Sequence, residues 1–308
     1  MGKVAFVFPG QGSQYIGMGR DFYEHEGAAR EIFDKAGQVT GMDIPGLCFE
    51  ENDRLDITEF TQIAMVATEV AILKVLEERG VQPDVTAGLS LGEYGAIVAS
   101  GAMRAEEAFA LVRRRGIYMQ EAVPTGGAMA AVLGLDSDVI EQTVENTEGI
   151  VSIANYNCPG QIVITGQTDA VAKAAESLQE KGAKKVIPLK VSGPFHSVML
   201  TEAGKRLKKD LERVHLMDFT IPYVANLTAD YVTRTEPVRE LLEKQISSPV
   251  RWQQSVERMI GDGVDTFVEI GPGRTLTGFV KKINRDVTAV HVDKYEDLPG
   301  ALEVLANA

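Results

Sequence analysis

The chain alternates short apolar runs with longer segments in which apolar residues recur at helical spacing. Residues 4–8 form an unbroken apolar run that ends at Pro9, which predicts a buried strand opening into a glycine-rich loop. Residues 61–79 carry apolar residues at helical spacing and end at Gly80, which predicts a helix with glycine at its C-terminal cap. This alternation predicts a mostly parallel sheet with helices on both faces. The other elements expected in this part are helices over 24–39, 93–100, 104–122, 199–214, 238–245 and 253–261 and strands over 84–88, 264–270 and 289–292.

A different order of elements follows the pair Gly126-Gly127. The pattern within residues 128–192 predicts strand, helix, strand, strand, helix and strand, which is the order of the ferredoxin-like fold. We therefore predict a large α/β part made of residues 1–127 and 193–308, and a small part, residues 128–192, inserted into it. The strands expected in the small part are 128–133, 151–156, 161–165 and 184–191, and the helices are 136–146 and 168–181.

Net charge and cysteine content narrow the class of protein. The 308 residues carry 31 Lys and Arg against 44 Asp and Glu, which gives a net charge of −13. An acidic chain repels nucleic acid and anionic membrane surfaces, so we expect neither as a partner. Cys48 and Cys158 lie far apart in the sequence, which favours reduced thiols in a cytoplasmic protein and no cysteine-based metal site. No apolar stretch approaches the roughly 18 residues of a membrane span.

The clearest chemical signal is Gly88-Leu89-Ser90-Leu91-Gly92, a G-x-S-x-G motif between an expected strand and an expected helix. A sharp turn from strand to helix leaves no room for side chains at the two glycine positions. The same turn pushes the serine hydroxyl outward at a helix N-terminus, where developing negative charge is favoured. The motif predicts that Ser90 is a nucleophile, and the alternative is a tight turn in which Ser90 only caps the helix.

A serine nucleophile needs a base, and the chain offers four histidines. His25 lies in an acidic polar stretch, His215 ends a charged expected helix, and His291 alternates with apolar residues in a terminal strand. His196 instead follows a strand at the predicted boundary between the two parts, where functional sites are often built. We predict that His196 is the base, and a purely structural histidine is the alternative.

Arg115 lies on the apolar stripe of the helix expected over 104–122, whereas Arg113 and Arg114 point away from it. A buried guanidinium must be paired, and its planar fork fits a carboxylate. The partner of Arg115 is therefore either a structural Asp or Glu or the carboxylate of a substrate.

The loop after the first strand contains Gly10 and Gly12 but has Tyr15 where a dinucleotide-binding loop has its third glycine. No Gly-Lys-Ser/Thr sequence follows, so the loop is not a phosphate-binding P-loop either. Such a loop can instead expose backbone N–H groups to an oxyanion.

Together these segments resemble the malonyl-CoA:acyl carrier protein transacylase family, in order from about residue 3 to residue 295. One position departs from the common family pattern, because Leu89 stands where many members have histidine. The resemblance implies an α/β-hydrolase-like core with an inserted ferredoxin-like part. The matching segments are 8–14, 88–94, 113–122, 159–166, 193–197 and 269–273.

The resemblance also implies roles for single residues. Ser90 matches the nucleophile, His196 the base and Arg115 the arginine that binds the malonyl carboxylate. The remaining matches are the oxyanion-hole N–H groups of Gln11 and Leu91, the polar residues Gln62 and Asn155 near the site, and Gln245, whose backbone carbonyl would orient the histidine.

The implied reaction transfers malonyl from malonyl-CoA to the phosphopantetheine thiol of acyl carrier protein, through an ester on Ser90, for fatty acid synthesis. Coenzyme A thioester is a substrate, and no metal, other cofactor or further protein subunit is expected. Three alternatives stay open. The first is a preference for methylmalonyl. In the family pattern, Phe195 beside the base favours a small substituent on the acyl α-carbon. The second is a serine hydrolase or thioesterase, which has no use for a buried Arg115. The third is a non-catalytic carrier-binding module, which would be expected to have lost Ser90 or His196.

Charge is unevenly distributed along the chain. Residues 1–60 hold five Lys and Arg against eleven Asp and Glu, whereas residues 181–215 hold nine against three. The carrier proteins known as partners of the family are acidic, so this basic stretch around His196 predicts a docking surface. A solvated basic helix face is the alternative. The lysines expected to take part are Lys184, Lys185, Lys205, Lys208 and Lys209.

Overall fold

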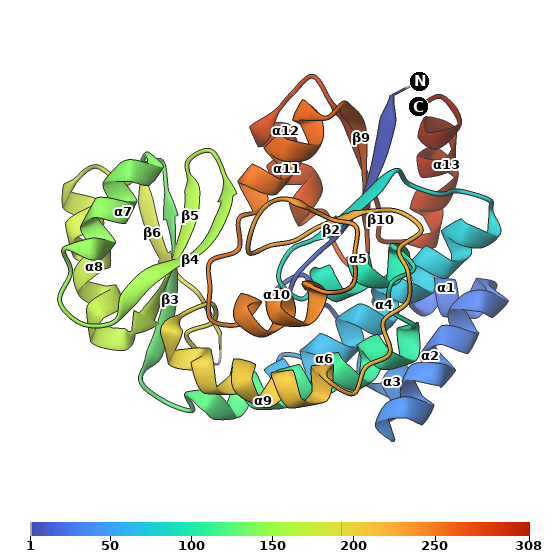
Figure 1. Ribbon diagram of the computed structural model, residues 1–308, viewed down its shortest axis with the longest axis horizontal. Helices are drawn as coiled ribbons and strands as arrows, with labels where there is room; N and C mark the ends of the chain where they lie inside the picture. The colour runs from blue at the N-terminus through green and yellow to red at the C-terminus, as the bar shows by residue number, and fades with distance from the viewer. Residues whose placement is uncertain (1, 192) are drawn as a thin grey trace.

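The structure, a computed structural model, describes residues 2–191 and 193–308 and contains two β-sheets (Figure 1). The larger sheet has the strand order β10-β9-β1-β2-β7-β8. All neighbouring strands in it run parallel except β7 and β8. The predicted mostly parallel α/β architecture is therefore confirmed. Its strands are β1 (Lys3–Phe8), β2 (Val85–Gly88), β7 (Tyr223–Val224), β8 (Tyr231–Val232), β9 (Val264–Ile270) and β10 (Thr288–Val292).

Helices cover both faces of this sheet. Alternate side chains of β1 therefore enter two separate hydrophobic clusters, one on each face. Phe6 and Phe8 pack with α2, α4 and α5, whereas Ala5 and Val7 pack with α11 and α12. The helices are α1 (Arg20–His25), α2 (Gly27–Thr40), α3 (Ile44–Phe49), α4 (Thr58–Glu78), α5 (Gly92–Ala99), α6 (Ala105–Ala122), α9 (Thr201–Leu211), α10 (Val238–Gln245), α11 (Trp252–Gly261), α12 (Thr275–Ile283) and α13 (Leu298–Ala306), with short 3₁₀ turns η1 (Val198–Leu200) and η2 (Tyr295–Asp297).

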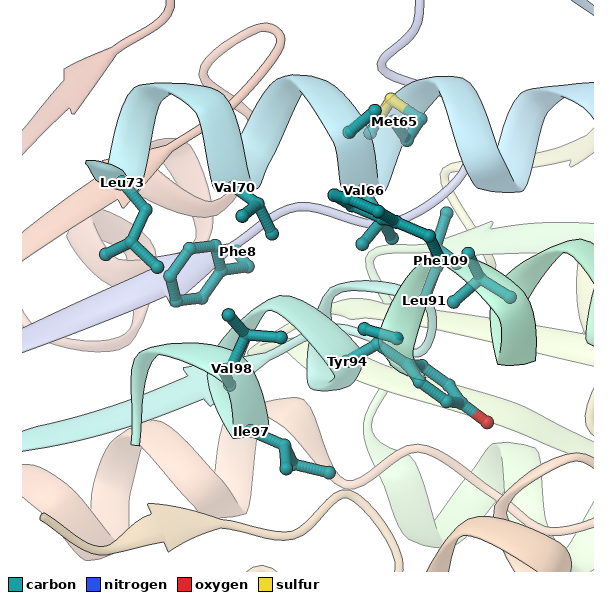
Figure 2. Close-up of a cluster of buried hydrophobic side chains, with 14 of the residues drawn as sticks. Phe8, Met65, Val66, Val70, Leu73, Leu91, Tyr94, Ile97, Val98 and Phe109 are labelled. Carbon is teal, nitrogen blue, oxygen red and sulfur yellow. The ribbon is translucent and has the colours of Figure 1, made fainter. Parts of the chain in front are cut away.

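Helix α4 is buried nearly all round, since it packs against α2, α5 and α6. Figure 2 shows Phe8 of β1 between α4 and α5, with Val70 and Leu73 on one side and Val98 on the other. Leu91 and Tyr94 belong to the same cluster. The turn between β2 and α5 is therefore fixed in place by packing against the hydrophobic core.

The smaller sheet is antiparallel, with the strand order β4-β5-β3-β6. One of its faces packs on α7 and α8 through residues such as Val132 and Ile164. The opposite face, which carries Met129, Ala131 and Val163, joins the main core of the larger part. This second face is what brings the small sheet to the candidate site. Its elements are β3 (Gly127–Leu133), α7 (Ser137–Glu145), β4 (Val151–Cys158), β5 (Gln161–Gln167), α8 (Thr168–Glu180) and β6 (Lys185–Pro188).

Some predicted elements are wrong in extent. The helix expected over 24–39 is two helices, α1 and α2, because Glu26 between them has extended backbone angles. The strand expected over 184–191 is shorter in the structure, where β6 spans only Lys185–Pro188. Ser192 lies outside the described residues. The helix expected over 199–214 starts as η1 and ends at Leu211, so His215 lies beyond its end. Helices α3, α12 and α13 and the two-residue strands β7 and β8 were not predicted. Among the described residues, no helix is long and apolar enough to cross a bilayer.

Candidate active site

Ser90 lies in a tight turn between β2 and α5, and its backbone φ of 53° is in the left-handed region. A Cβ atom on Gly88 would come 2.0 Å from the backbone of Gly92, and one on Gly92 would come 2.1 Å from the carbonyl oxygen of Phe8. Both positions of the motif therefore require glycine for a steric reason. The strained turn is held by the surrounding core, as backbone strain at functional sites generally is.

The Oγ atom of Ser90 lies 2.7 Å from Nε2 of His196. On the other side of the ring, Nδ1 lies 2.9 Å from the backbone carbonyl oxygen of Gln245. Because a carbonyl oxygen only accepts, Nδ1 carries the proton and Nε2 turns its lone pair toward the serine hydroxyl. Gln245 stands at the C-terminal end of α10, which holds this carbonyl in place.

Burial lowers the pKa of His196 to about 4, and the positive charge of Arg115 acts in the same direction. The hydrogen bonds to the backbone of Gln245 and Ser248 oppose this shift but do not cancel it. The imidazole is therefore neutral at physiological pH, which is the form that can accept a proton from Ser90.

Arg115 comes from α6 and is only 1% exposed. Its Nη1 donates to Oε1 of Gln62 at 2.9 Å, and its Nη2 donates to Oγ of Ser90 at 3.1 Å and to Oε1 of Gln245 at 3.0 Å. All three acceptors are uncharged, and no carboxylate forms an ion pair with Arg115 within residues 2–191 and 193–308. Burial accordingly lowers the pKa of Arg115. The structural Asp or Glu considered as its partner is thus not in contact with the guanidinium.

A cavity of about 220 Å³ opens in front of Ser90, between the larger sheet and the free face of the smaller one. Two N–H groups at this cavity, those of Gln11 and Leu91, have no hydrogen-bond partner among the described residues. Gln11 is held by its side chain, which donates to Thr58 at 3.1 Å. Asn155 reaches the cavity from β4. The residues that line the cavity include Gln11, Gln62, Ser90, Leu91, Arg115, Met119, Met129, Asn155, Val163, Phe195 and His196.

Two buried residues near the serine were missed by sequence reasoning. The side chain of Asn226 accepts from the N–H of Ser90 at 2.6 Å and donates to the carbonyl of Gly88 at 2.6 Å, so it braces both sides of the turn. Glu93, on the first turn of α5, accepts from Gln245 Nε2 at 2.6 Å. Glu93 directly follows the serine motif, so its position in the sequence could have indicated a place near the site. Nothing in the sequence near Asn226 indicated one.

The five lysines expected to form one docking surface fall into two groups. Lys205, Lys208 and Lys209 share α9, which begins shortly after His196. Lys184 and Lys185 stand at the start of β6, where Lys185 pairs with Leu133 at the end of β3.

The other end of β3, at Gly127, packs against Pro194, beside His196. Six residues of strand, roughly 20 Å, separate Gly127 from Leu133. Lys184 and Lys185 therefore lie at the Leu133 end of β3, opposite the end that packs against Pro194.

Among the residues that the structure describes, no three His, Cys, Asp or Glu side chains come together as metal ligands would. What converges instead is a serine, a neutral histidine and a pair of free N–H groups at one cavity. This combination belongs to enzymes that pass an acyl group through an ester on serine.

Comparison with known proteins identifies the class further. The model of the acyl transferase domain family matches residues 5–297, so the chain belongs to this family. It is 45% identical over 310 aligned residues to the malonyl CoA-acyl carrier protein transacylase of Bacillus subtilis, covering 99% of this chain and 98% of the relative.

Two solved structures have nearly the same fold as this chain. The malonyl CoA-acyl carrier protein transacylase of Clostridium perfringens superimposes with a TM-score of 0.96 at 41% identity, over 99% of this chain and 98% of that one. The second is a malonyl-transacylase, PlMCAT, in complex with its type II PKS acyl-carrier protein AntF. It superimposes with a TM-score of 0.95 at 39% identity, over 98% of this chain and 99% of that one.

Proposed function

We propose that this protein transfers the malonyl group of malonyl-CoA to the phosphopantetheine thiol of acyl carrier protein, through a malonyl ester on Ser90. The observation that carries the proposal is the pairing of Arg115 with Ser90 at one cavity. Arg115 is a buried cation whose contacts are all with uncharged atoms, 3.1 Å from the candidate nucleophile. A substrate that carries both a thioester and a carboxylate satisfies both groups at once.

In the first half-reaction, Nε2 of His196 takes the proton of Ser90 as Oγ forms a bond to the thioester carbon. The N–H groups of Gln11 and Leu91 stabilise the oxyanion that develops, and one such donor typically contributes about 3–4 kcal/mol. The bond from carbon to sulfur then breaks, and coenzyme A leaves with the proton from His196. The malonyl ester keeps its carboxylate on Arg115.

In the second half-reaction, the phosphopantetheine thiol gives its proton to His196 and attacks the ester carbon. The bond from carbon to Oγ breaks, and Ser90 recovers the proton. The chemistry is complete with side chains and backbone groups of this chain, so the coenzyme A thioester serves as substrate and no resident cofactor is invoked. Cytoplasmic location, expected from the cysteine content, stays a prediction.

Polar side chains around the cavity complete the acyl pocket. Gln62 holds Nη1 of Arg115, which leaves the guanidinium turned toward Ser90. Asn155 faces the same cavity and is suited to the thioester or to the pantetheine amide. Phe195, which is buried beside His196, limits the space for a substituent on the malonyl carbon and favours malonyl over methylmalonyl.

The two sheets correspond to an α/β-hydrolase-like core, residues 1–127 and 193–308, and a ferredoxin-like insertion, residues 128–192. The parallel order of β1, β2 and β9 around the serine turn supports the first assignment. The element order β3-α7-β4-β5-α8-β6 and the antiparallel pairing support the second. This arrangement makes the insertion one wall of the acyl pocket, since its free face carries Met129 and Val163.

The carrier protein docks on the basic side of α9. Lys205, Lys208 and Lys209 lie on this helix, which follows His196 closely in the chain. Two of these lysines pair with Glu202 and Glu243 at distances of 2.6 and 3.1 Å, so an acidic partner must compete for them. Lys184 and Lys185 lie at the Leu133 end of β3 and take no part in the docking surface proposed on α9.

The proposal is tested by mass spectrometry of the protein after brief exposure to malonyl-, methylmalonyl- or acetyl-CoA. We expect rapid addition of one malonyl group on Ser90, slower addition of the other two, and removal of the label by carrier protein. Ser90→Ala should remain unlabelled. Release of malonate to water faster than transfer to carrier protein would make the protein a hydrolase, and a labelled Ser90→Ala would place the nucleophile elsewhere.

A further inference from the structure

A buried carboxylate, that of Glu93, lies behind the candidate serine and has no part in the reaction steps above. Its Oε2 accepts from Gln245 Nε2 at 2.6 Å and from the backbone N–H of Asn226 at 3.3 Å. Burial raises the pKa of Glu93 to about 7, and these two hydrogen bonds together with Arg115 limit that rise. Burying an ionised carboxylate costs free energy unless hydrogen bonds compensate it, so the groups that contact Glu93 show what holds it in place.

Its main partner, Gln245, contacts the base, the buried guanidinium and the serine turn. Its backbone carbonyl accepts from His196 Nδ1 at 2.9 Å, and its side-chain Oε1 accepts from Arg115 Nη2 at 3.0 Å. Its Nε2 donates to the backbone carbonyl of Ser90 at 2.8 Å. The position of the base, of the guanidinium and of the serine turn therefore all depend on this one glutamine.

The orientation of the Gln245 amide is decided by what surrounds it. Nε2 of Gln245 faces the backbone carbonyl of Ser90, which only accepts hydrogen bonds. It also faces the carboxyl group of Glu93, which only accepts when it is ionised. Oε1 faces Arg115, which only donates. A reversed amide would point its oxygen at a carboxylate and its NH₂ at a cation, so the ionised Glu93 allows a single orientation.

We propose that Glu93 is a positioning residue: its carboxylate fixes the side-chain amide of Gln245, which in turn holds Arg115, His196 and Ser90 in their places. The inference rests on the proposed function of this site. Glu93 touches neither substrate nor the reacting atoms, and it acts through Gln245.

The substitution Glu93→Gln isolates this effect because it keeps the shape of the side chain and removes its charge. Glutamine at this position can present either an oxygen or an NH₂ group, so the Gln245 amide is no longer confined to one orientation. Arg115 then loses a fixed acceptor. Small displacements of reacting groups can lower rates by about 100-fold.

The experiment measures the single-turnover rate of malonyl-serine formation at pH 8, above the pKa of Glu93, where the carboxylate is ionised. Glu93→Gln should lower this rate by about 10- to 100-fold. The matched control is Glu59→Gln, which removes a carboxylate 2.7 Å from Arg113, on the same helix as Arg115 but outside the cavity. The control should stay within about twofold of the wild type, in line with the modest contribution of part-exposed ion pairs.

A double-mutant cycle with Gln245→Leu separates positioning from a general effect on folding. Gln245→Leu keeps the backbone carbonyl for His196 and removes the amide. If Glu93 acts through that amide, Glu93→Gln should add less than about threefold in the Gln245→Leu background. Losses that multiply would overturn the inference, as would a Glu93→Gln rate equal to that of the control.

A second variant covers the case in which Glu93→Gln does not fold. Glu93→Asp retains the charge but withdraws the carboxylate from Gln245 by one methylene, and it should show the same selective loss of rate. A wild-type rate from Glu93→Asp would also overturn the inference. Failure of the wild-type protein to form malonyl-Ser90 would instead refute the proposed function, so the two failures are distinguishable.

Discussion

Replacing Arg115 with alanine should remove the preference for malonyl over acetyl. The guanidinium donates to Ser90, Gln62 and Gln245 and meets no carboxylate in the described part of the chain. An acyl group with a carboxylate gains a buried partner for this cation, and an acetyl group does not. The matched control is Arg113→Ala, because Arg113 lies on the same helix but is 22% exposed and paired with Glu59 outside the cavity.

The size of the effect follows from the burial of Arg115. Truncating one partner of a buried, hydrogen-bonded charge pair costs about 2–5 kcal/mol, which corresponds to about 30- to 5,000-fold in the rate with malonyl-CoA. Acetyl transfer loses, at the reacting serine, only the contact of Arg115 with Ser90, one hydrogen bond worth about 0.5–1.5 kcal/mol, or roughly two- to twelvefold. The ratio of the two rates should therefore fall by at least about twofold and by much more at the upper end.

The assay compares kcat/KM for malonyl-CoA and acetyl-CoA in the wild type and both variants, with carrier protein as acceptor. Alanine at position 115 also leaves the buried oxygens of Gln62 and Gln245 without a donor, at about 1–3 kcal/mol each, so thermal unfolding is measured in parallel. Equal losses for both acyl groups in a folded Arg115→Ala protein would refute the carboxylate-binding role.

Two further predictions concern the base and the docking surface. The ¹⁵N NMR signals of the His196 imidazole, assigned with His196→Gln, should remain those of a neutral ring down to about pH 5, because its pKa is about 4. Since the unfolded chain binds that proton near pH 6.5, His196 contributes stability above pH 6.5 that is lost as the pH falls toward 4; a ring that titrates near pH 6.5 would contradict this. Exchanging Lys205, Lys208 and Lys209 for Glu should slow transfer to carrier protein at low salt much more than acylation by malonyl-CoA. The same exchange at Lys184 and Lys185 should have little effect, and equal effects of the two sets would argue against docking on α9.

Local sterics and periodicity made part of this protein predictable. The steric limits at Gly88 and Gly92 act between residues close in the sequence or on the adjacent strand, so the G-x-S-x-G motif alone indicated the turn around Ser90. The burial of Arg115 followed from its place on the apolar stripe of α6, because an amphipathic helix turns one face to the core. The order of strands and helices in the small part likewise followed from local patterns.

Only the tertiary structure decided which groups meet around these residues. Arg115 contacts Gln62 and Gln245, which lie 53 and 130 positions away in the chain, and no local pattern encodes such pairs. Asn226 reaches the turn at Ser90 across 136 residues. The pKa of His196 depends on burial in the folded chain and on the nearby guanidinium of Arg115.

The division between the two has a physical reason. Backbone sterics and the alternation of apolar and polar residues act over a few positions, so the sequence by itself determined the serine turn, the buried arginine and the order of elements in the small part. Hydrogen-bond partners, desolvation and the separation of the lysines depend on how distant segments pack. Only the folded chain therefore decided that Arg115 faces uncharged oxygens, that Glu93 contacts Gln245, and that Lys185 pairs with the Leu133 end of β3.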